Sequence, residues 1–172
     1  MTPLARLRAT GFGVATVTLV LDQLVKWAML GPLHLREVGQ IHLLPIFNFT
    51  FTMNTGVSLG LLTAGSNAQR WALVGLTAAI AVMVLVWLLR ERRQGDVAAL
   101  GLVLGGALGN IVDRMVRGYV VDYLDLHFGE YRPFLVFNLA DCAISIGVLI
   151  ILARSFLSRE KRGRAGDPAP ES

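Results

Sequence analysis

Four apolar stretches of roughly membrane-spanning length restrict this chain to folds that a lipid bilayer can hold. They lie at about residues 9–30, 71–89, 97–112 and 134–153, and 54% of the 172 residues are hydrophobic while only 16% are charged. Within a bilayer only helices and closed barrels satisfy every backbone polar group, and about 20 apolar residues make one spanning helix. We therefore predict an all-α membrane protein, a four-helix transmembrane bundle that forms a single domain over residues 1–157.

The first stretch reaches spanning length only if Asp22 and Lys26 lie inside it. Because they are four residues apart, both fall on one helical face, with the acid N-terminal to the base as a favourable ion pair requires. Arg6 and Arg8 before an apolar core also fit a cleavable signal peptide, but no small-x-small cleavage site follows. We interpret the stretch as a permanent anchor.

Positive charge is distributed unevenly between the two ends of the predicted bundle. Five Arg residues belong to the loop side: Arg36, Arg70, Arg114, Arg117 and Arg132. Ten Lys and Arg residues belong to the side with both termini: Arg6, Arg8, Arg90, Arg92, Arg93, Arg154, Arg159, Lys161, Arg162 and Arg164. Since the cytoplasmic side carries the excess of positive charge, we predict cytoplasmic termini, a disordered cytoplasmic tail at 158–172 and two long polar loops outside.

The first outer loop contains a segment with the period of a β-strand. In IFNFTFTMNTG, one face carries Phe47, Phe49, Phe51 and Met53, and the other carries Asn48, Thr50, Thr52 and Asn54. Alternation of this kind is typical of a strand with one apolar and one polar face. We predict a small extramembrane β-sheet at about residues 41–62 on the outer membrane surface, although a cap over helix ends would show the same pattern.

The third stretch is rich in glycine. Gly101, Gly105 and Gly109 recur every four residues and so lie on one helical face. Small residues in this arrangement let neighbouring membrane helices approach closely. We predict a packing seam along this helix.

Polar side chains converge near the outer ends of the predicted helices. Asn110, Asp113 and Arg114 share one helical face, and Asn138 lies one turn above Asp141. At 1.5 Å per residue, Asp141 lies about 10 Å below the outer surface, and Asp22 lies at a similar depth. Two carboxylates that meet across a small gap share a proton, and the ionised member can then activate water while the protonated member donates to a carbonyl. Peptide hydrolysis is therefore a candidate activity.

The simplest interpretation of any one buried aspartate is a structural ion pair, as Asp22 with Lys26 or Asp113 with Arg114. Asp122 and Asp141 have no cation at helical spacing, so they are the better catalytic pair.

Other hydrolytic chemistries lack their patterns. His34, His42 and His127 show no zinc-binding spacing, and no Gly-x-Ser-x-Gly sequence is present. Cys142 follows Asp141 but points about 100° away on a helix, so we assign it a packing role. We expect no metal and no cofactor.

Four segments carry a resemblance to a known family: LDQLVK, MNTGVSLGLL, GGALGNIVDRMVRGYVVDYLD and FNLADCAISIG. In this order they resemble bacterial lipoprotein signal peptidase, also called signal peptidase II. The resemblance implies an aspartic endopeptidase of the bacterial plasma (inner) membrane that cleaves diacylglyceryl-modified prolipoproteins immediately before the lipidated cysteine, with its active site near the outer face. The implied partners are lipid-modified prolipoproteins and membrane lipids, with no nucleic acid, and we expect a monomer.

The resemblance also implies roles for single residues. The catalytic aspartates of the family match Asp122 in VVD and Asp141 in NLAD. Positions that bind substrate or support the site match Asn54, Gly56, Asn110, Asp113, Arg114, Asn138, Asp22 and Lys26, and the small sheet is expected to cradle the substrate. The chain departs from the family pattern at Val57, Ser58, Leu59 and Leu135.

Two other classes of membrane protein fit part of the pattern. A proton-coupled transporter or channel subunit would also carry intramembrane Asp, Lys and Arg, but the chain has no internal repeat and its acids gather near one face. A non-enzymatic scaffold would leave Asp141 unexplained.

Overall fold

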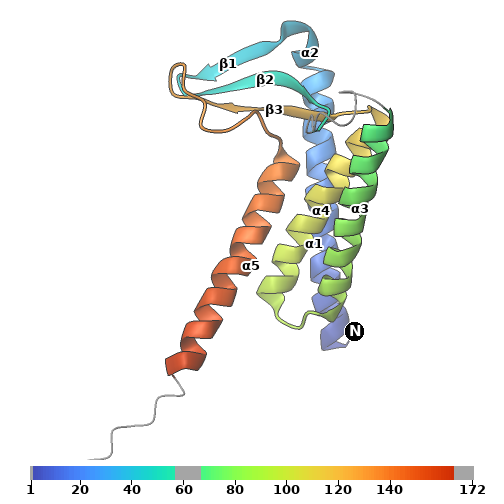
Figure 1. Ribbon diagram of the computed structural model, residues 1–172, viewed down its shortest axis with the longest axis vertical. Coiled ribbons are helices and arrows are strands. Elements are labelled where there is room, and N and C mark those ends of the chain that lie inside the picture. Colours follow the sequence, from blue (N-terminus) through green and yellow to red (C-terminus); the bar gives the residue numbers. More distant parts are fainter. Residues whose placement is uncertain (1, 57–66, 165–172) are drawn as a thin grey trace, which may run out of the picture.

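The computed structural model describes residues 2–56 and 67–164. Four long helices, α1 (Pro3–Leu30), α3 (Asn67–Arg90), α4 (Gln94–Val116) and α5 (Leu139–Arg164), form a bundle, and a small sheet lies across one end of it (Figure 1). Each of the four contains a segment long and apolar enough to cross a membrane. The predicted four-helix membrane fold is confirmed. We call the end under the sheet the sheet end, and the end where α1 begins and α5 finishes the termini end.

The helix bounds differ from the predicted ones because local capping decides where helices begin. α1 begins at Pro3 instead of near residue 9, since the Thr2 side chain accepts a hydrogen bond from the Ala5 N–H at 3.2 Å and proline suits the first turn. α5 begins at Leu139 instead of near 134 and continues to Arg164. Residues 158–164 are therefore helical, contrary to the expected tail, and residues 165–172 lie outside the described part of the chain.

α4 packs against α1, α3 and α5, and its glycines set the distance to α1. A Cβ atom at Gly101 or Gly105 would lie 2.5 Å from a backbone oxygen of α1, and one at Gly109 would lie 2.5 Å from a carboxylate oxygen of Asp22. Such approaches are too close for any side chain, so the predicted seam is confirmed. It brings Asp22 of α1 directly against α4.

The sheet is antiparallel with the strand order β1 (Gln40–Leu44), β2 (Phe47–Asn54), β3 (Val120–Leu126). A short helix, α2 (Leu35–Val38), precedes it. The first two strands fall within the predicted outer loop, whereas β3 was not predicted and comes from the second loop. Its pairing sets Thr52 opposite Asp122, so the sheet carries one of the two candidate catalytic residues.

The apolar face of β2 anchors the sheet to the bundle, as the alternation predicts. Phe49 and Phe51 pack onto a buried cluster that includes Met29 of α1 and Tyr123 of β3. The rings of Phe49 and Tyr123 meet edge to face, with centroids 6.2 Å apart. This packing holds β3 above the sheet end of the helices.

Candidate active site

The first turn of α5 places Asp141 through a reciprocal cap. The Asn138 Oδ1 accepts a hydrogen bond from the Asp141 N–H at 2.9 Å, and the Asp141 Oδ2 accepts one from the Asn138 N–H at 3.3 Å. This is the geometry of a capping box, in which the residue before the helix and the third helical residue satisfy each other. The sequence Asn-Leu-Ala-Asp thus sets both the start of the helix and the position of the carboxylate.

Asp122 lies on β3 and is 1% exposed. The Asn138 Nδ2 donates a hydrogen bond to its Oδ1 at 2.6 Å, and Asn54 of β2 makes a second side-chain hydrogen bond. Burial, followed by the nearby charge of Asp141, raises the pKa of Asp122 to about 6, although the two amide contacts act in the opposite direction. Asp122 therefore retains a proton to higher pH than an ordinary aspartate.

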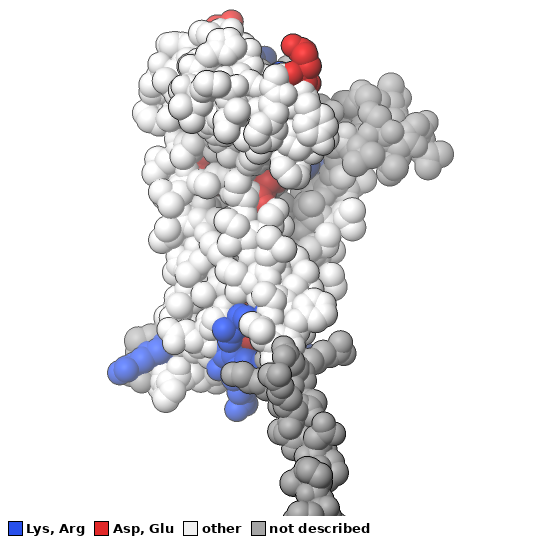
Figure 2. Space-filling view, turned by 90° about the vertical axis from the view of Figure 1, so that its left-hand side faces the viewer, with Lys and Arg blue, Asp and Glu red and all other residues white. Residues whose placement is uncertain are grey.

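Asn138 joins the two aspartates. Its side chain donates to Asp122, while its backbone N–H and its Oδ1 are both paired with Asp141. Asn110 of α4 supports this bridge, because its Nδ2 donates to the Asp141 Oδ1 at 2.8 Å and its Oδ1 accepts from the Asn138 Nδ2 at 3.3 Å. The two predicted carboxylates thus lie together with the three predicted asparagines, Asn54, Asn110 and Asn138, at the sheet end, where acidic atoms are visible just below the sheet in Figure 2.

A buried ion network lies directly behind this bridge. The Lys26 Nζ is 2.8 Å from the Asp22 Oδ2 and 2.8 Å from the Asp113 Oδ2, and all three side chains are fully buried. Lys26 also donates to the Asn110 Oδ1 at 3.4 Å. The predicted pair of Asp22 and Lys26 is confirmed, and the network connects it to an asparagine that contacts Asp141.

The predicted pair of Asp113 with Arg114 is wrong. Asp113 accepts instead from Lys26 and from Arg117, which lies one helical turn after it, and its Oδ2 also accepts from the Val121 N–H at 3.1 Å. Arg114 forms no ion pair among residues 2–56 and 67–164, and its buried Nε has no hydrogen-bond partner there. Its charge interacts with that of Asp141, then with those of Asp122 and Asp113. Arg114 is thus close enough to both candidate catalytic aspartates to feel their charge, without a direct ion pair to Asp113.

Two further side chains hold the first turn of α5. The Asp22 Oδ1 accepts a hydrogen bond from the Ala140 N–H at 3.0 Å, and the Tyr123 hydroxyl accepts one from the Leu139 N–H at 3.3 Å. The first N–H groups of a helix have no partner within the helix. Because residues from α1 and β3 satisfy them here, the backbone that carries Asp141 is tied to both elements.

At the end of β2, the Asn54 Oδ1 accepts from the Gly56 N–H at 3.0 Å. Gly56 has a φ of +98°, a conformation that favours glycine. Gly56 therefore supports Asn54, which in turn contacts Asp122. The departures at Val57, Ser58 and Leu59 lie outside the described residues, whereas Leu135 is 91% exposed in the segment before α5.

Sequence reasoning missed three residues of the site, Gln23, Arg117 and Tyr123. Gln23 bridges Asp22 and Asp113 through its Nε2, at 3.1 and 3.2 Å. Arg117 was detectable, because it follows Asp113 by the same four-residue interval that marked Lys26 after Asp22. No local pattern marks Tyr123, whose contact with α5 depends on the position of β3.

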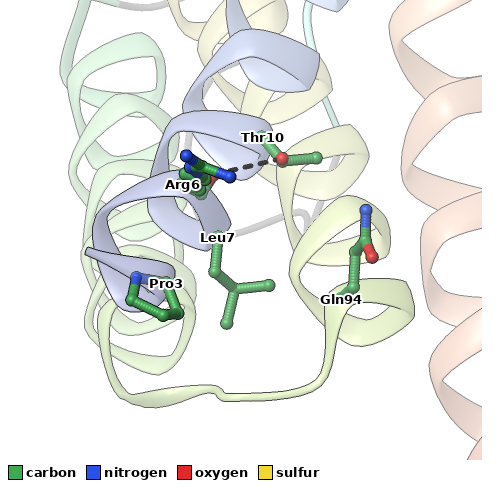
Figure 3. Close-up of a pocket in the computed structure, with 5 residues that line it drawn as sticks. All are labelled: Pro3, Arg6, Leu7, Thr10 and Gln94. Carbon is green, nitrogen blue, oxygen red and sulfur yellow. Dashed lines mark hydrogen bonds between the residues drawn. The ribbon is translucent and has the colours of Figure 1, made fainter. Parts of the chain in front are cut away.

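A cavity of about 480 Å³ lies at the termini end, far from the aspartates, lined by Pro3, Arg6, Leu7, Thr10 and Gln94 (Figure 3). Among the described residues that line it there is no acid and no base to activate the Thr10 hydroxyl, so it does not compete as an active site. Within the described residues, no group of three or more His, Cys, Asp and Glu side chains is placed to hold a metal ion. Cys142 is a partly buried free cysteine of α5.

The sequence from residue 14 to residue 157 matches the family model described as signal peptidase (SPase) II. A lipoprotein signal peptidase of Rhizorhabdus wittichii is 55% identical over 155 residues, which cover 90% of each chain. One of Sphingopyxis alaskensis is 50% identical over the same length and coverage. A bacterial membrane enzyme solved in meso at 1.9 Å resolution superposes with a TM-score of 0.72 at 26% identity, covering 85% of this chain and 92% of its own.

Proposed function

The chain belongs to the signal peptidase II family, and on that premise we propose that it is an aspartic endopeptidase of prolipoproteins. Its substrates carry a diacylglyceryl group, and it cleaves the signal peptide immediately before the lipidated cysteine. The observation that carries the proposal is the bridge made by one asparagine, since Asn138 contacts the carboxylates of Asp122 and Asp141 together. The acids lie at the end of the bundle where a signal peptide leaves the bilayer.

The two carboxylates lie in different environments and therefore have different roles in the reaction. Asp122, whose pKa is raised to about 6, holds the shared proton and donates it to the oxygen of the scissile carbonyl. Asp141, whose carboxylate accepts hydrogen bonds from the Asn110 side chain and the Asn138 N–H, takes a proton from the attacking water. The tetrahedral intermediate then collapses as Asp141 returns that proton to the leaving amine nitrogen, and Asp122 recovers its proton from the intermediate's hydroxyl.

The neighbouring groups bind and orient. Arg114, whose charge has no acidic partner within 4 Å in the described residues, binds the developing negative charge or a substrate carbonyl. Asn54 positions Asp122, and Asn110 positions Asp141. The network of Asp22, Lys26 and Asp113 supports Asn110 and the first turn of α5 without contacting the substrate.

The distribution of charge and the family together indicate where the protein lies and how it is oriented in the membrane. The termini end carries the excess of Lys and Arg, so it faces the cytoplasm of a bacterial plasma membrane, and the sheet end faces outward. The single domain acts as a monomer, with its sheet against the lipid-modified segment of the substrate. A cysteine introduced after Ser158 should resist a membrane-impermeant reagent in intact cells, in a Cys142→Ser background.

Cleavage of a defined substrate tests the function. The purified protein in detergent is incubated with a prolipoprotein whose cysteine carries the diacylglyceryl group, and with the same prolipoprotein without the lipid. We expect a shortened product from the lipidated form only. An intact lipidated substrate would reject the proposal, and equal cleavage of both forms would reject the lipid requirement while leaving the peptidase activity.

A further inference from the structure

An apolar groove runs along the bundle between α1 and α3, on a different side of α4 from the aspartates. It encloses about 370 Å³, with Phe12 and Leu19 on the α1 wall, Ala78 and Leu85 on the α3 wall, and Leu104 and Leu108 of α4 as its floor. Of the described residues that line it, Thr16 alone is polar. All three helices are candidate membrane spans, so the groove opens at the depth of lipid chains.

A cation stands at the mouth of this groove. Arg8 lies one helical turn before Phe12, and its Nη2 donates to the carbonyl oxygen of Leu89, one turn after Leu85, at 2.9 Å. The guanidinium thus spans the two walls at the termini end. Its Nε is buried without a hydrogen-bond partner, and none of the ion pairs within the described residues includes Arg8.

The apolar groove and the arginine at its mouth together indicate what kind of molecule binds there. A chain-shaped apolar groove fits an acyl chain, and an arginine without an acidic partner at its mouth fits a phosphate. Basic sites between membrane helices that bind lipid headgroups have this arrangement. We propose that one phospholipid, from the leaflet at the termini end, binds here with an acyl chain between α1 and α3 and its phosphate on Arg8.

This lipid site is distinct from the cavity in Figure 3, with which it shares no lining residue. Arg6 lies two residues before Arg8 and therefore about 200° around the helix, on the side of Gln94. It has the same charge and the same depth, but no apolar groove continues from it in the cavity lining. Arg6 thus provides a matched control for Arg8.

A lipid titration tests the proposal. Phosphatidylglycerol is added to the delipidated protein in detergent while the thermal unfolding midpoint is recorded, with a diacylglycerol of the same chains and inorganic phosphate as separate probes. We expect phosphatidylglycerol alone to raise the midpoint. Arg8→Gln should raise the concentration for half of this effect about tenfold, as loss of one charge-assisted contact implies, while Arg6→Gln leaves it unchanged.

Equal weakening by Arg6→Gln and Arg8→Gln would mean nonspecific attraction and overturn the site. A response to diacylglycerol or to phosphate alone that equals the phosphatidylglycerol response would also overturn it. A second pair of variants tests the groove. Thr16→Phe places a ring in the groove from an exposed position that lines it, and the control Val17→Phe adds the same ring at an exposed position that does not line it. We expect only Thr16→Phe to abolish the lipid response, and an equal loss in both variants would contradict the proposal.

Discussion

The two ends of the bundle use ion pairs in different environments. At the sheet end, Lys26 contacts Asp22 and Asp113 at 2.8 Å each, with all three side chains at 0% exposure. At the termini end, Arg154 pairs with Asp96 while 42% of the Arg154 side chain remains exposed. Water and salt screen the second pair, whereas the charges of the first are shielded from water and depend on one another and on Arg117. The same type of contact therefore determines geometry at one end and contributes little at the other.

The largest effect is expected from the two bridged carboxylates. Asp122→Asn and Asp141→Asn should each lower kcat/KM for the lipidated substrate about a thousandfold or more, because each removes one half of the proton exchange. Kinetics with the purified variants measure this. Near-normal turnover of either variant would exclude that residue from the mechanism.

The matched control for this substitution is Asp125→Asn on the same strand. Asp125 is equally buried, but it accepts from Thr50 and pairs with Arg132, outside the bridge. We expect turnover close to that of the unmodified protein. A loss as large as that of Asp122→Asn would show that burial of a carboxylate on β3, and not contact with Asn138, decides activity.

The next largest effect sharpens the contrast between the two ends. Lys26→Ala leaves the buried Asp22 without a cation and Asp113 with Arg117 alone, and should lower the free energy of unfolding by about 3–5 kcal/mol. Arg154→Ala removes a partly exposed partner and should cost about 1 kcal/mol or less. Denaturation in detergent measures the loss of unfolding free energy in both variants. Equal losses would contradict the difference between the two ends of the bundle.

Removing both charges separates stability from activity at the sheet end. In Asp22→Leu/Lys26→Leu, Asp113 keeps Arg117 as its partner, so much of the stability should return. The Ala140 N–H loses its acceptor, however, so cleavage should remain about tenfold or more below normal. A double variant that is stable and fully active would make the network structural only.

A third effect depends on pH. The pKa of Asp122 rises from its ordinary 3.8 to about 6 on folding, so protonation stabilises the fold. That contribution is complete below the unfolded pKa and is lost as the pH rises through about 6, and for a shift of about two units it amounts to roughly 3 kcal/mol. The stability of Asp122→Asn relative to the unmodified protein should therefore increase from pH 4 to pH 7. A difference that stays constant with pH would contradict the shift.

The smallest effect concerns the hydroxyl that caps α5. Tyr123→Phe keeps the edge-to-face contact with Phe49 but leaves the Leu139 N–H without its acceptor. We expect a loss of about 1 kcal/mol in stability and a few-fold loss in kcat with an unchanged KM. Tyr131→Phe, in an exposed loop position, is the control and should change neither. A raised KM with normal kcat would instead place Tyr123 in substrate binding.

Much of the fold and of the site was predictable because the signals are local. Apolar length indicated four spans, a period of two indicated β2, and glycines every four residues indicated the seam with α1. The segment Asn-Leu-Ala-Asp contains both members of a helix cap, so its geometry needs no distant partner. The assignment of Asp113 to Arg114 failed because adjacent residues on a helix do not face each other, whereas Arg117 lies one turn after Asp113 on the same face. The strand β3 was missed because it forms only against β2.

The sequence by itself determined that acidic and amide side chains gather near one end of a membrane bundle and that Asp122 and Asp141 have no cation at helical spacing. Only the tertiary structure decided what those acids contact. The Asp22 carboxylate reaches the Ala140 N–H across 118 residues of sequence, and Asn138 reaches Asp122 across 16 residues from a different element. Periodicity describes neighbours on one helix or strand. These contacts depend instead on how closely α1 and α5 approach α4, which its glycines permit.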